Sequence, residues 1–156
     1  MNDYIEAIRD RMGTQLVFIP GVRALILNPA GEILLHLRTD VPYWGLPSGS
    51  VELDETALEA LKREVQEETA LEVLAAEPMA LYSGREQRFQ YPNGDRIQCF
   101  ALAFIVRQWQ GHPRADGVEG SEVRFFPLES LPENLLPLHR ATIEDYRHFD
   151  GSFIVS

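Results

Sequence analysis

Three glutamates end one predicted helix in a pattern that could hold a divalent cation. Glu64, Glu67 and Glu68 lie in the segment ALEALKREVQEET, and on a helical wheel Glu67 and Glu68 fall within roughly 60° of Glu64. Like charges four residues apart repel, and carboxylates in a last turn face the negative end of the helix dipole. Mg²⁺ or Mn²⁺ would reverse this repulsion, because both take oxygen ligands. The alternative is a solvated acidic face, because glutamate is a good helix former.

The helix that carries these glutamates is predicted to run from Glu55 to about Thr69, with Asp54 as its N-cap. Its core-facing stripe is predicted to consist of three aliphatic residues, Leu58, Leu61 and Val65. Ala57 and Ala60 share the acidic face, where their small side chains would leave room for a ligand. The loop before the helix, Tyr43 to Glu52, is interrupted by glycine and proline.

A longer pattern around the glutamates resembles the Nudix box of MutT-like hydrolases, GX5EX7REUXEEXGU, in which U is aliphatic. Residues 49–71 follow its spacing from Gly49 through Glu55 and Arg63 to Leu71. The one specified position that differs is the second glycine, replaced by Ala70. If that position has a positive φ, alanine costs about 1 kcal/mol against glycine.

The resemblance implies a fold and an activity. The fold would be of the α/β class, a Nudix α/β/α sandwich with a mixed central sheet and the box helix packed on it. The activity would be Mg²⁺-dependent hydrolysis of a phosphoanhydride bond, with Mn²⁺ able to substitute. Substrates would be a nucleoside di- or triphosphate, or a nucleoside diphosphate linked to another moiety, as in ADP-ribose, nucleotide sugars and dinucleoside polyphosphates. The alternative is a Nudix-fold module that binds nucleotide, or regulates, without catalysis.

The resemblance also implies roles for individual residues. Glu64, Glu67, Glu68 and the carbonyl group of Ser48 would bind the metal. The catalytic set would be Glu64, Glu67, Arg63 and Glu122. Arg63 would orient the acids, while Gly49 and Glu55 would shape the loop. Ser48 replaces the first of two glycines that are usual in the family.

A further carboxylate is expected from the loop before a late strand. Glu122, in GSEVRFF, resembles that residue best, and Glu119 is the second candidate. The alternative for both is a solvated loop residue.

Substrate contacts are expected from the segment YSGREQRFQY and from the end of an earlier strand. Arg38, Arg85 and Arg88 could bind phosphate oxygens, and Phe89 or Tyr91 could stack on a base. The alternative is an ordinary strand with core aromatics. The four histidines lack the spacing of a zinc hydrolase and any partner nearby in sequence, so they are interpreted as surface or core residues.

Residues 1–156 are predicted to form one domain without repeats or linkers. Helices are predicted over 1–12, most clearly 4–12, and over 137–149. Strands 16–27 and 32–38 are predicted to form a hairpin, and strands 71–82, 88–91 and 96–107 follow, with PNGD as a second hairpin turn. A last strand, VRFF, completes a mixed sheet with helices on its faces.

The composition limits the partners. The net charge of −10 disfavours binding to a nucleic acid polymer or an anionic membrane, so a small nucleotide is the expected ligand. The sequence lacks a signal peptide and a membrane-spanning stretch, and a cytoplasmic protein is expected. The single cysteine, Cys99, is expected to be a buried strand residue. Homodimers are common in the family that the chain resembles.

Overall fold

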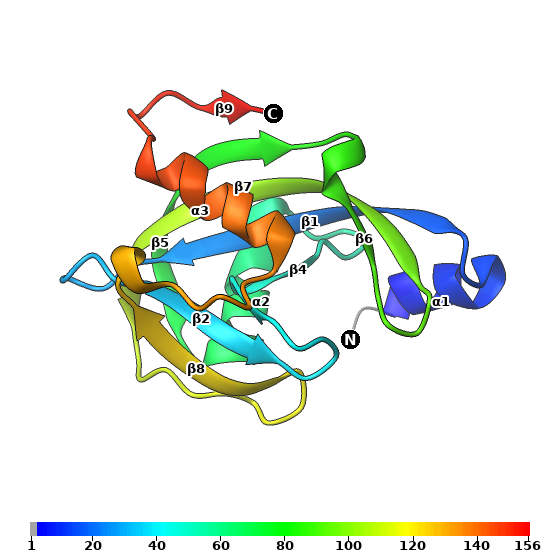
Figure 1. Cartoon of the computed structure of the whole chain (residues 1–156), viewed down its shortest axis with the longest axis horizontal. Coiled ribbons are helices and arrows are strands. Elements are labelled where there is room, and N and C mark those ends of the chain that lie inside the picture. The colour runs from blue at the N-terminus through cyan, green and yellow to red at the C-terminus, as the bar shows by residue number, and fades with distance from the viewer. Residues whose placement is uncertain (1–2) are drawn as a thin grey trace.

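The computed structural model describes residues 3–156 as three helices and two sheets (Figure 1). The helices are α1 (Asp3–Met12), α2 (Ala57–Thr69) and α3 (Pro137–Arg147). The strands are β1 (Leu16–Ile26), β2 (Ile33–Arg38), β3 (Trp44–Gly45), β4 (Ser48–Ser50), β5 (Glu72–Tyr82), β6 (Arg88–Gln90), β7 (Arg96–Gln110), β8 (Gly120–Phe126) and β9 (Ile154–Val155). Short 3-10 turns are η1 (Arg85–Gln87) and η2 (Leu128–Ser130). Residues 1 and 2 of the predicted N-terminal helix lie outside the described part.

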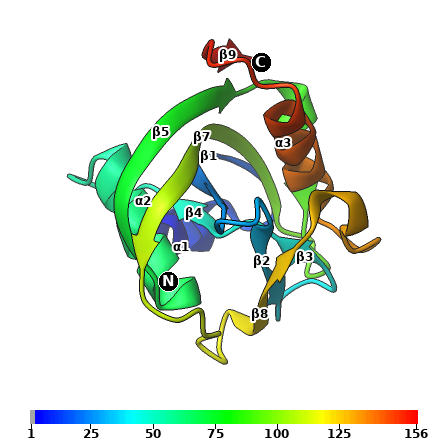
Figure 2. The ribbon, with the colours of Figure 1, turned by 90° about the vertical axis from the view of Figure 1, so that its left-hand side faces the viewer.

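The larger sheet has the strand order β4-β1-β7-β5-β9, with β6 paired to β7. Strands β1 and β7 are parallel, as are β5 and β9, and the other pairs are antiparallel. The smaller sheet has the order β3-β2-β8. Helices α2 and α3 lie on opposite sides of the sheets (Figure 2). The predicted α/β class, with a mixed sheet and the box helix packed on it, is confirmed.

Two apolar clusters lie on opposite faces of β1, because successive side chains of a strand point to opposite faces. Val22, Ala24 and Ile26 pack with α2, whereas Leu25 and Leu27 belong to the cluster on the α3 side. Strand β1 is therefore covered on both faces, which explains the unbroken apolar run ALIL.

The predicted hairpin between 16–27 and 32–38 is wrong. Its turn forms, with the Asn28 N–H donating to the Glu32 carbonyl and an isolated bridge between Leu27 and Ile33, but the strands then diverge. Strand β1 pairs with β4 and β7, and β2 pairs with β3 and β8. The partners β4, β7 and β8 come from segments that are distant in sequence, which a local turn pattern does not specify. The second predicted hairpin, at PNGD, forms between β6 and β7.

Helix α2 begins later than predicted, and its N-cap is Thr56 rather than Asp54. The Glu59 N–H donates to the Thr56 hydroxyl at 3.2 Å, and the Thr56 N–H donates to the Glu59 carboxylate at 2.8 Å. These bonds form a capping box. Asp54 instead lies in the preceding turn with a φ of 64°. The C-terminal helix, predicted over 137–149, ends at Arg147.

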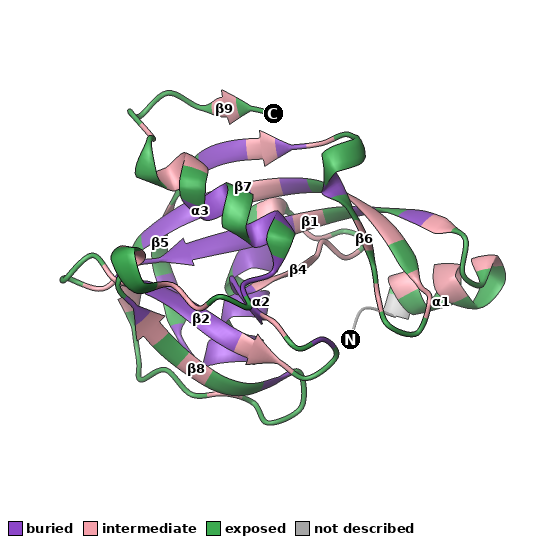
Figure 3. Ribbon diagram, in the orientation of Figure 1, coloured by how far each residue is buried: buried purple, intermediate pink, exposed green. Residues whose placement is uncertain are grey.

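The buried face of α2 also differs from the prediction. Leu58 is 42% exposed, whereas Ala60, Leu61 and Val65 are buried in the core. Figure 3 shows buried residues along α2. The core-facing side is rotated toward the glutamates, because Glu64 and Glu68 belong to it and are only 8% and 4% exposed. Among the described residues, no helix is long and apolar enough to cross a bilayer.

Helix α2 ends at Ala70, whose φ of 62° is left-handed. Its N–H donates to the Gln66 carbonyl, as in a helix C-cap that usually carries glycine. Ala70→Gly should raise the free energy of unfolding by about 1 kcal/mol, because glycine adopts this conformation without a Cβ clash. In a domain of this size the melting temperature should rise by roughly 2–4 °C.

The matched control is Ala141→Gly, at an exposed interior position of α3. There the same substitution should lower stability by about 0.5–1 kcal/mol, because glycine loses more backbone freedom in a right-handed helix. Thermal unfolding of both variants measures the two effects. A loss of stability in both would contradict the assigned cost of alanine at position 70.

Candidate metal and nucleotide site

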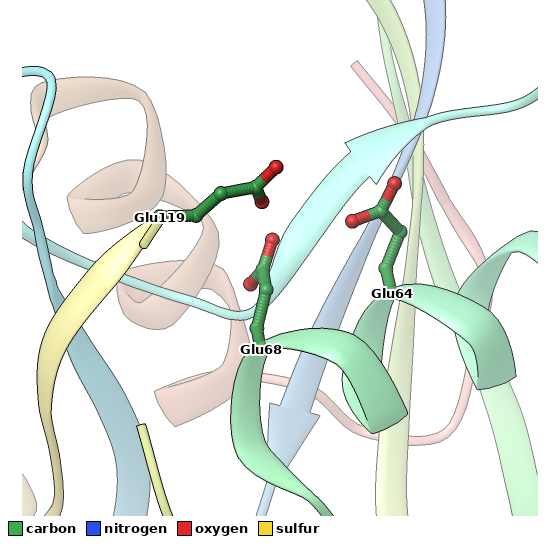
Figure 4. Close-up of side chains that lie close together, drawn as sticks. All are labelled: Glu64, Glu68 and Glu119. Carbon is green, nitrogen blue, oxygen red and sulfur yellow. The ribbon is translucent and has the colours of Figure 1, made fainter. Parts of the chain in front are cut away.

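Three carboxylates converge at the end of α2. Oxygen atoms of Glu64, Glu68 and Glu119 lie within 4.8 Å of one another, and Figure 4 shows Glu119 reaching from the start of the β8 region toward the two helical side chains. Glu67, the other box glutamate, is half-exposed and lies outside this group. The predicted acidic face is thus divided between two buried acids and one at the surface.

Arg63 holds the box together. Its Nε and Nη2 donate to the two carboxylate oxygens of Glu55 at 2.7 and 3.0 Å, and Nη2 also donates to the Ser50 carbonyl at 3.0 Å. Its Nη1 donates to Glu64 at 2.8 Å and to Glu67 at 3.4 Å. These hydrogen bonds lower the pKa of Glu55. A single guanidinium therefore ties loop and helix together and limits the positions that the Glu64 carboxylate can take.

Gly49 is required by close packing. A Cβ atom at this position would overlap the carboxyl group of Glu64. The neighbouring Ser48 N–H donates to Glu68 Oε2 at 3.2 Å. Strand β4 thus lies directly against both buried acids, and a side chain at position 49 would displace the Glu64 carboxyl group.

The electrostatics of the acids favour neutral carboxyl groups when no cation is bound. Burial raises the pKa of Glu64, and burial together with the charge of Glu64 raises the pKa of Glu68 well above its ordinary value. His36 Nε2 lies 3.3 Å from Glu68 Oε2, but burial, followed by the charge of Arg38, lowers the pKa of His36 to about 4. His36 therefore supplies little positive charge to Glu68 near neutral pH.

The loop before β8 brings Glu119 to the group. Asp116 Oδ1 accepts hydrogen bonds from the N–H groups of Val118, Glu119 and Gly120, at 2.9, 3.0 and 3.1 Å. The Thr39 N–H donates to the Glu119 carbonyl at 3.1 Å. This small network fixes the backbone that carries the Glu119 side chain.

Glu122, the first candidate from the sequence, has different surroundings. Its carboxylate lies 3.5 Å from Arg124 Nε, and both side chains are at least half-exposed. It shares strand parity with Phe126, which packs on the α3 side, whereas Val123 packs with the α2 cluster. Glu122 therefore points to the face of β8 away from the box helix.

A cavity of about 830 Å³ adjoins the acids, and the box glutamates line it together with Ser48 and Glu119. Of the predicted substrate residues, Arg38, Phe89 and Tyr91 line the cavity. Arg38 donates two hydrogen bonds to Asp40, and its Cζ lies 6.0 Å from the Tyr91 ring centroid. Phe89 and Tyr91 pack edge to face at 5.1 Å.

Arg85 and Arg88 are not among the described residues that line the cavity. Arg85 lies in η1, and Arg88 donates to the Gln98 side chain at 2.8 Å from an exposed position. Strand alternation separates Arg88 and Phe89 onto opposite faces of β6, which the sequence pattern left open.

Three cavity residues were missed as functional candidates: Arg23, His36 and His139. Both histidines are buried, as a core interpretation allows, but each has a polar neighbour that the sequence did not reveal. The Leu46 N–H donates to His139 Nδ1 at 2.9 Å, and His36 contacts Glu68. For Arg23, a charged residue within the apolar run GVRALIL was the one available clue.

Comparisons with known proteins agree with this geometry. The NUDIX domain family model matches residues 17–146. An 8-oxo-dGTP diphosphatase of Haemophilus influenzae is 32% identical over 78% of this chain and 90% of its own length. An ADP-ribose pyrophosphatase of Methanocaldococcus jannaschii is 34% identical over 78% of this chain and 69% of its own length.

Solved structures show the same architecture. The crystal structure of a MutT NUDIX hydrolase from Burkholderia pseudomallei is 26% identical, covers 82% of this chain and 97% of its own, and has a TM-score of 0.71. The NUDIX domain of Shewanella oneidensis NrtR complexed with ADP ribose, 18% identical over 94% of this chain and 96% of its own, shares the fold with a TM-score of 0.69. The chain belongs to the NUDIX domain family.

Gly49→Ala should weaken divalent-cation binding by at least about tenfold, because the added methyl group displaces the Glu64 carboxylate from a position that Arg63 holds. Titration calorimetry with Mn²⁺ measures the effect without reference to activity. Ser50→Ala, on the same strand, is the control and should bind like the wild type. Equal affinity of Gly49→Ala and wild type would show that Glu64 does not take part in binding.

Glu68→Gln should stabilise the metal-free protein, and the gain should grow as the pH rises above about 4.5, the ordinary pKa of the carboxyl group. The raised pKa of folded Glu68 contributes stability below that value, and this contribution is lost as the pH rises through the folded pKa. Glutamine stays neutral throughout. A gain of 1 kcal/mol would correspond to roughly 2–4 °C.

Thermal unfolding in EDTA between pH 4.5 and 8 measures this difference. Glu67→Gln, which removes a half-exposed carboxylate from the same helix, is the matched control. A difference between Glu68→Gln and wild type that stays constant with pH would contradict the effect of burial on Glu68.

Proposed function

We propose that the protein is a divalent-metal-dependent pyrophosphohydrolase that acts on a nucleoside di- or triphosphate or on a nucleoside diphosphate linked to another moiety. The observation that carries the proposal is the group of three carboxylates beside a cavity of about 830 Å³, a volume in the range of small-molecule sites. The related diphosphatase and pyrophosphatase support the same chemistry.

The residues present fit Mg²⁺ or Mn²⁺. The donor set is all oxygen, two of its members are buried with raised pKa values, and Gly49 lets the Glu64 carboxyl group lie directly against β4. Glu64, Glu68 and Glu119 would hold the ion, and the Ser48 carbonyl is a proposed further ligand. When bound, the cation would offset phosphate charge and lower the pKa of a water molecule.

The remaining residues would position the substrate. Arg63 fixes the Glu64 carboxylate, and Arg38 would donate its free N–H groups to phosphate oxygens. Water would attack one phosphorus atom, the anhydride P–O bond would break, and a carboxylate would accept the proton of the water. Glu67 lines the cavity from a half-exposed position and is the proposed acceptor of that proton. No covalent intermediate is needed.

The experiment is a hydrolysis assay with nucleoside triphosphates, ADP-ribose, nucleotide sugars and dinucleoside polyphosphates, with Mg²⁺, Mn²⁺ or EDTA. At least one class should be hydrolysed, and only with a divalent cation. A protein that binds nucleotides, with a higher melting temperature, but hydrolyses none would be the non-catalytic module instead.

A matched pair of variants tests the source of the additional carboxylate. Glu119→Gln should lower kcat/KM by about 100-fold, because it removes one charge from the ligand group. Glu122→Gln, three positions away on the opposite side of β8, should stay within about twofold of wild type. The reverse result would assign the role to Glu122 and contradict the proposed ligand set.

A further inference from the structure

Arg23 is a buried cation without an acidic partner. Its side chain is 3% exposed, and among residues 3–156 no carboxylate forms an ion pair with it. Its neighbours are neutral: Nη1 donates to the Thr142 hydroxyl at 3.0 Å, Nη2 donates to the Gln87 amide oxygen at 2.7 Å, and Cζ lies 5.2 Å from the Tyr82 ring centroid.

This arrangement lowers the stability of the protein when no ligand is bound. An arginine side chain in a protein stays charged, and a buried charge costs free energy unless it is paired. The guanidinium has five N–H groups, and the Thr142 and Gln87 acceptors take two of them. The others are available to a ligand that enters the cavity which Arg23 lines.

The position of Arg23 relates it to the acidic group. Strands β1 and β4 pair Arg23 with Ser48, and the Ser48 N–H contacts Glu68. Arg23 points to the α3 side of β1, whereas the neighbouring Val22 points to the α2 side. The carboxylates of α2 and the Arg23 side chain therefore line the cavity from opposite faces of β1, and the phosphates would bind at the carboxylates.

The cavity walls next to Arg23 suit a flat aromatic ring. Ile19 of β1 and Ile97 of β7 lie on the same sheet face as Arg23, Leu138 faces them from α3, and Phe89 comes from β6. Gly21, two residues before Arg23, also lines the cavity. A nucleobase placed here would be buried among apolar groups and would meet the arginine at its edge.

We propose that Arg23 selects the nucleobase, favouring a purine with an oxygen at C6 over adenine. This inference rests on the proposed function. The O6 and N7 atoms of guanine or hypoxanthine are both acceptors on one edge, and they match the parallel N–H groups of a guanidinium. Adenine presents N7 but also a donor amino group, which would face the donors of Arg23. Gln87 and Thr142 would act as positioning residues that hold the guanidinium from behind.

The test compares kcat/KM for ITP and ATP, which share the sugar and the phosphates but differ at C6, with GTP as a third substrate. The wild type should favour ITP and GTP over ATP by at least about tenfold. Arg23→Met should bring the ITP/ATP ratio near one. Arg23→Lys, which keeps the charge but loses the fork, should also lower it. Arg107→Met, at an exposed arginine of β7 paired with Glu77, is the control and should leave the ratio unchanged.

Two outcomes would overturn the inference while leaving the proposed function intact. One is a wild type that hydrolyses ATP or ADP-ribose as well as ITP. The other is an Arg23→Met variant, folded by thermal unfolding, that keeps the wild-type ratio. If Arg23→Met does not fold, the inference is tested by the ITP/ATP ratio of kcat/KM in the wild type and in Arg23→Lys.

Failure of the proposed function would be recognised separately, as a wild type that hydrolyses none of the panel. Binding of IMP and AMP in EDTA, measured by calorimetry, then tests Arg23 without catalysis or metal. Tighter binding of IMP, lost in Arg23→Met, would support base selection, and equal binding of the two nucleotides would overturn it.

Discussion

Like charges held inside the protein are the constraint on which this structure depends. Glu64 and Glu68 lie on the core-facing side of α2, beside Ala60, Leu61 and Val65. Burial of two carboxylates one helical turn apart opposes folding, through both desolvation and repulsion. The surrounding structure offsets part of this cost, and it leaves a concentration of oxygen ligands that a divalent cation would complete.

The compensating contacts explain the Nudix box in physical terms. Arg63 is bonded to Glu55, Glu64 and Glu67 and to the backbone of β4, so the loop and the helix form one unit. Gly49 is the residue that lets β4 approach Glu64. The capping box at Thr56 fixes where the helix begins and therefore the rotation of its faces. The alanine at position 70 carries a backbone cost but keeps the hydrogen bond of the helix end.

Both sheets contribute residues to the site. Strand β1 pairs with β4 and contains Arg23. Strand β2, in the smaller sheet, contains His36 and Arg38. Strand β8 pairs with β2, which brings the Glu119 loop toward the end of α2. Separation of β1 from β2 thus makes room for the cavity, and a simple hairpin would have closed it. The charges that line the cavity include the carboxylates on the α2 side of β1 and the guanidinium of Arg23 on the α3 side.

The sequence by itself determined the family, the box helix and the identity of the helical acids, because these depend on spacings within a few turns of one segment. It also determined most strands and the turn at PNGD, which are local properties of the chain. Tertiary structure alone decided three things. The partners of β1 and β2 depend on contacts far apart in sequence. The proposed preference for Glu119 over Glu122 depends on position, because Glu119 approaches the box glutamates from the loop before β8, whereas Glu122 points to the other face of that strand. The proposed role of Arg23 depends on its burial without an ion pair among residues 3–156. That burial is set by the packing of α3 and β7 against β1, which no local pattern records.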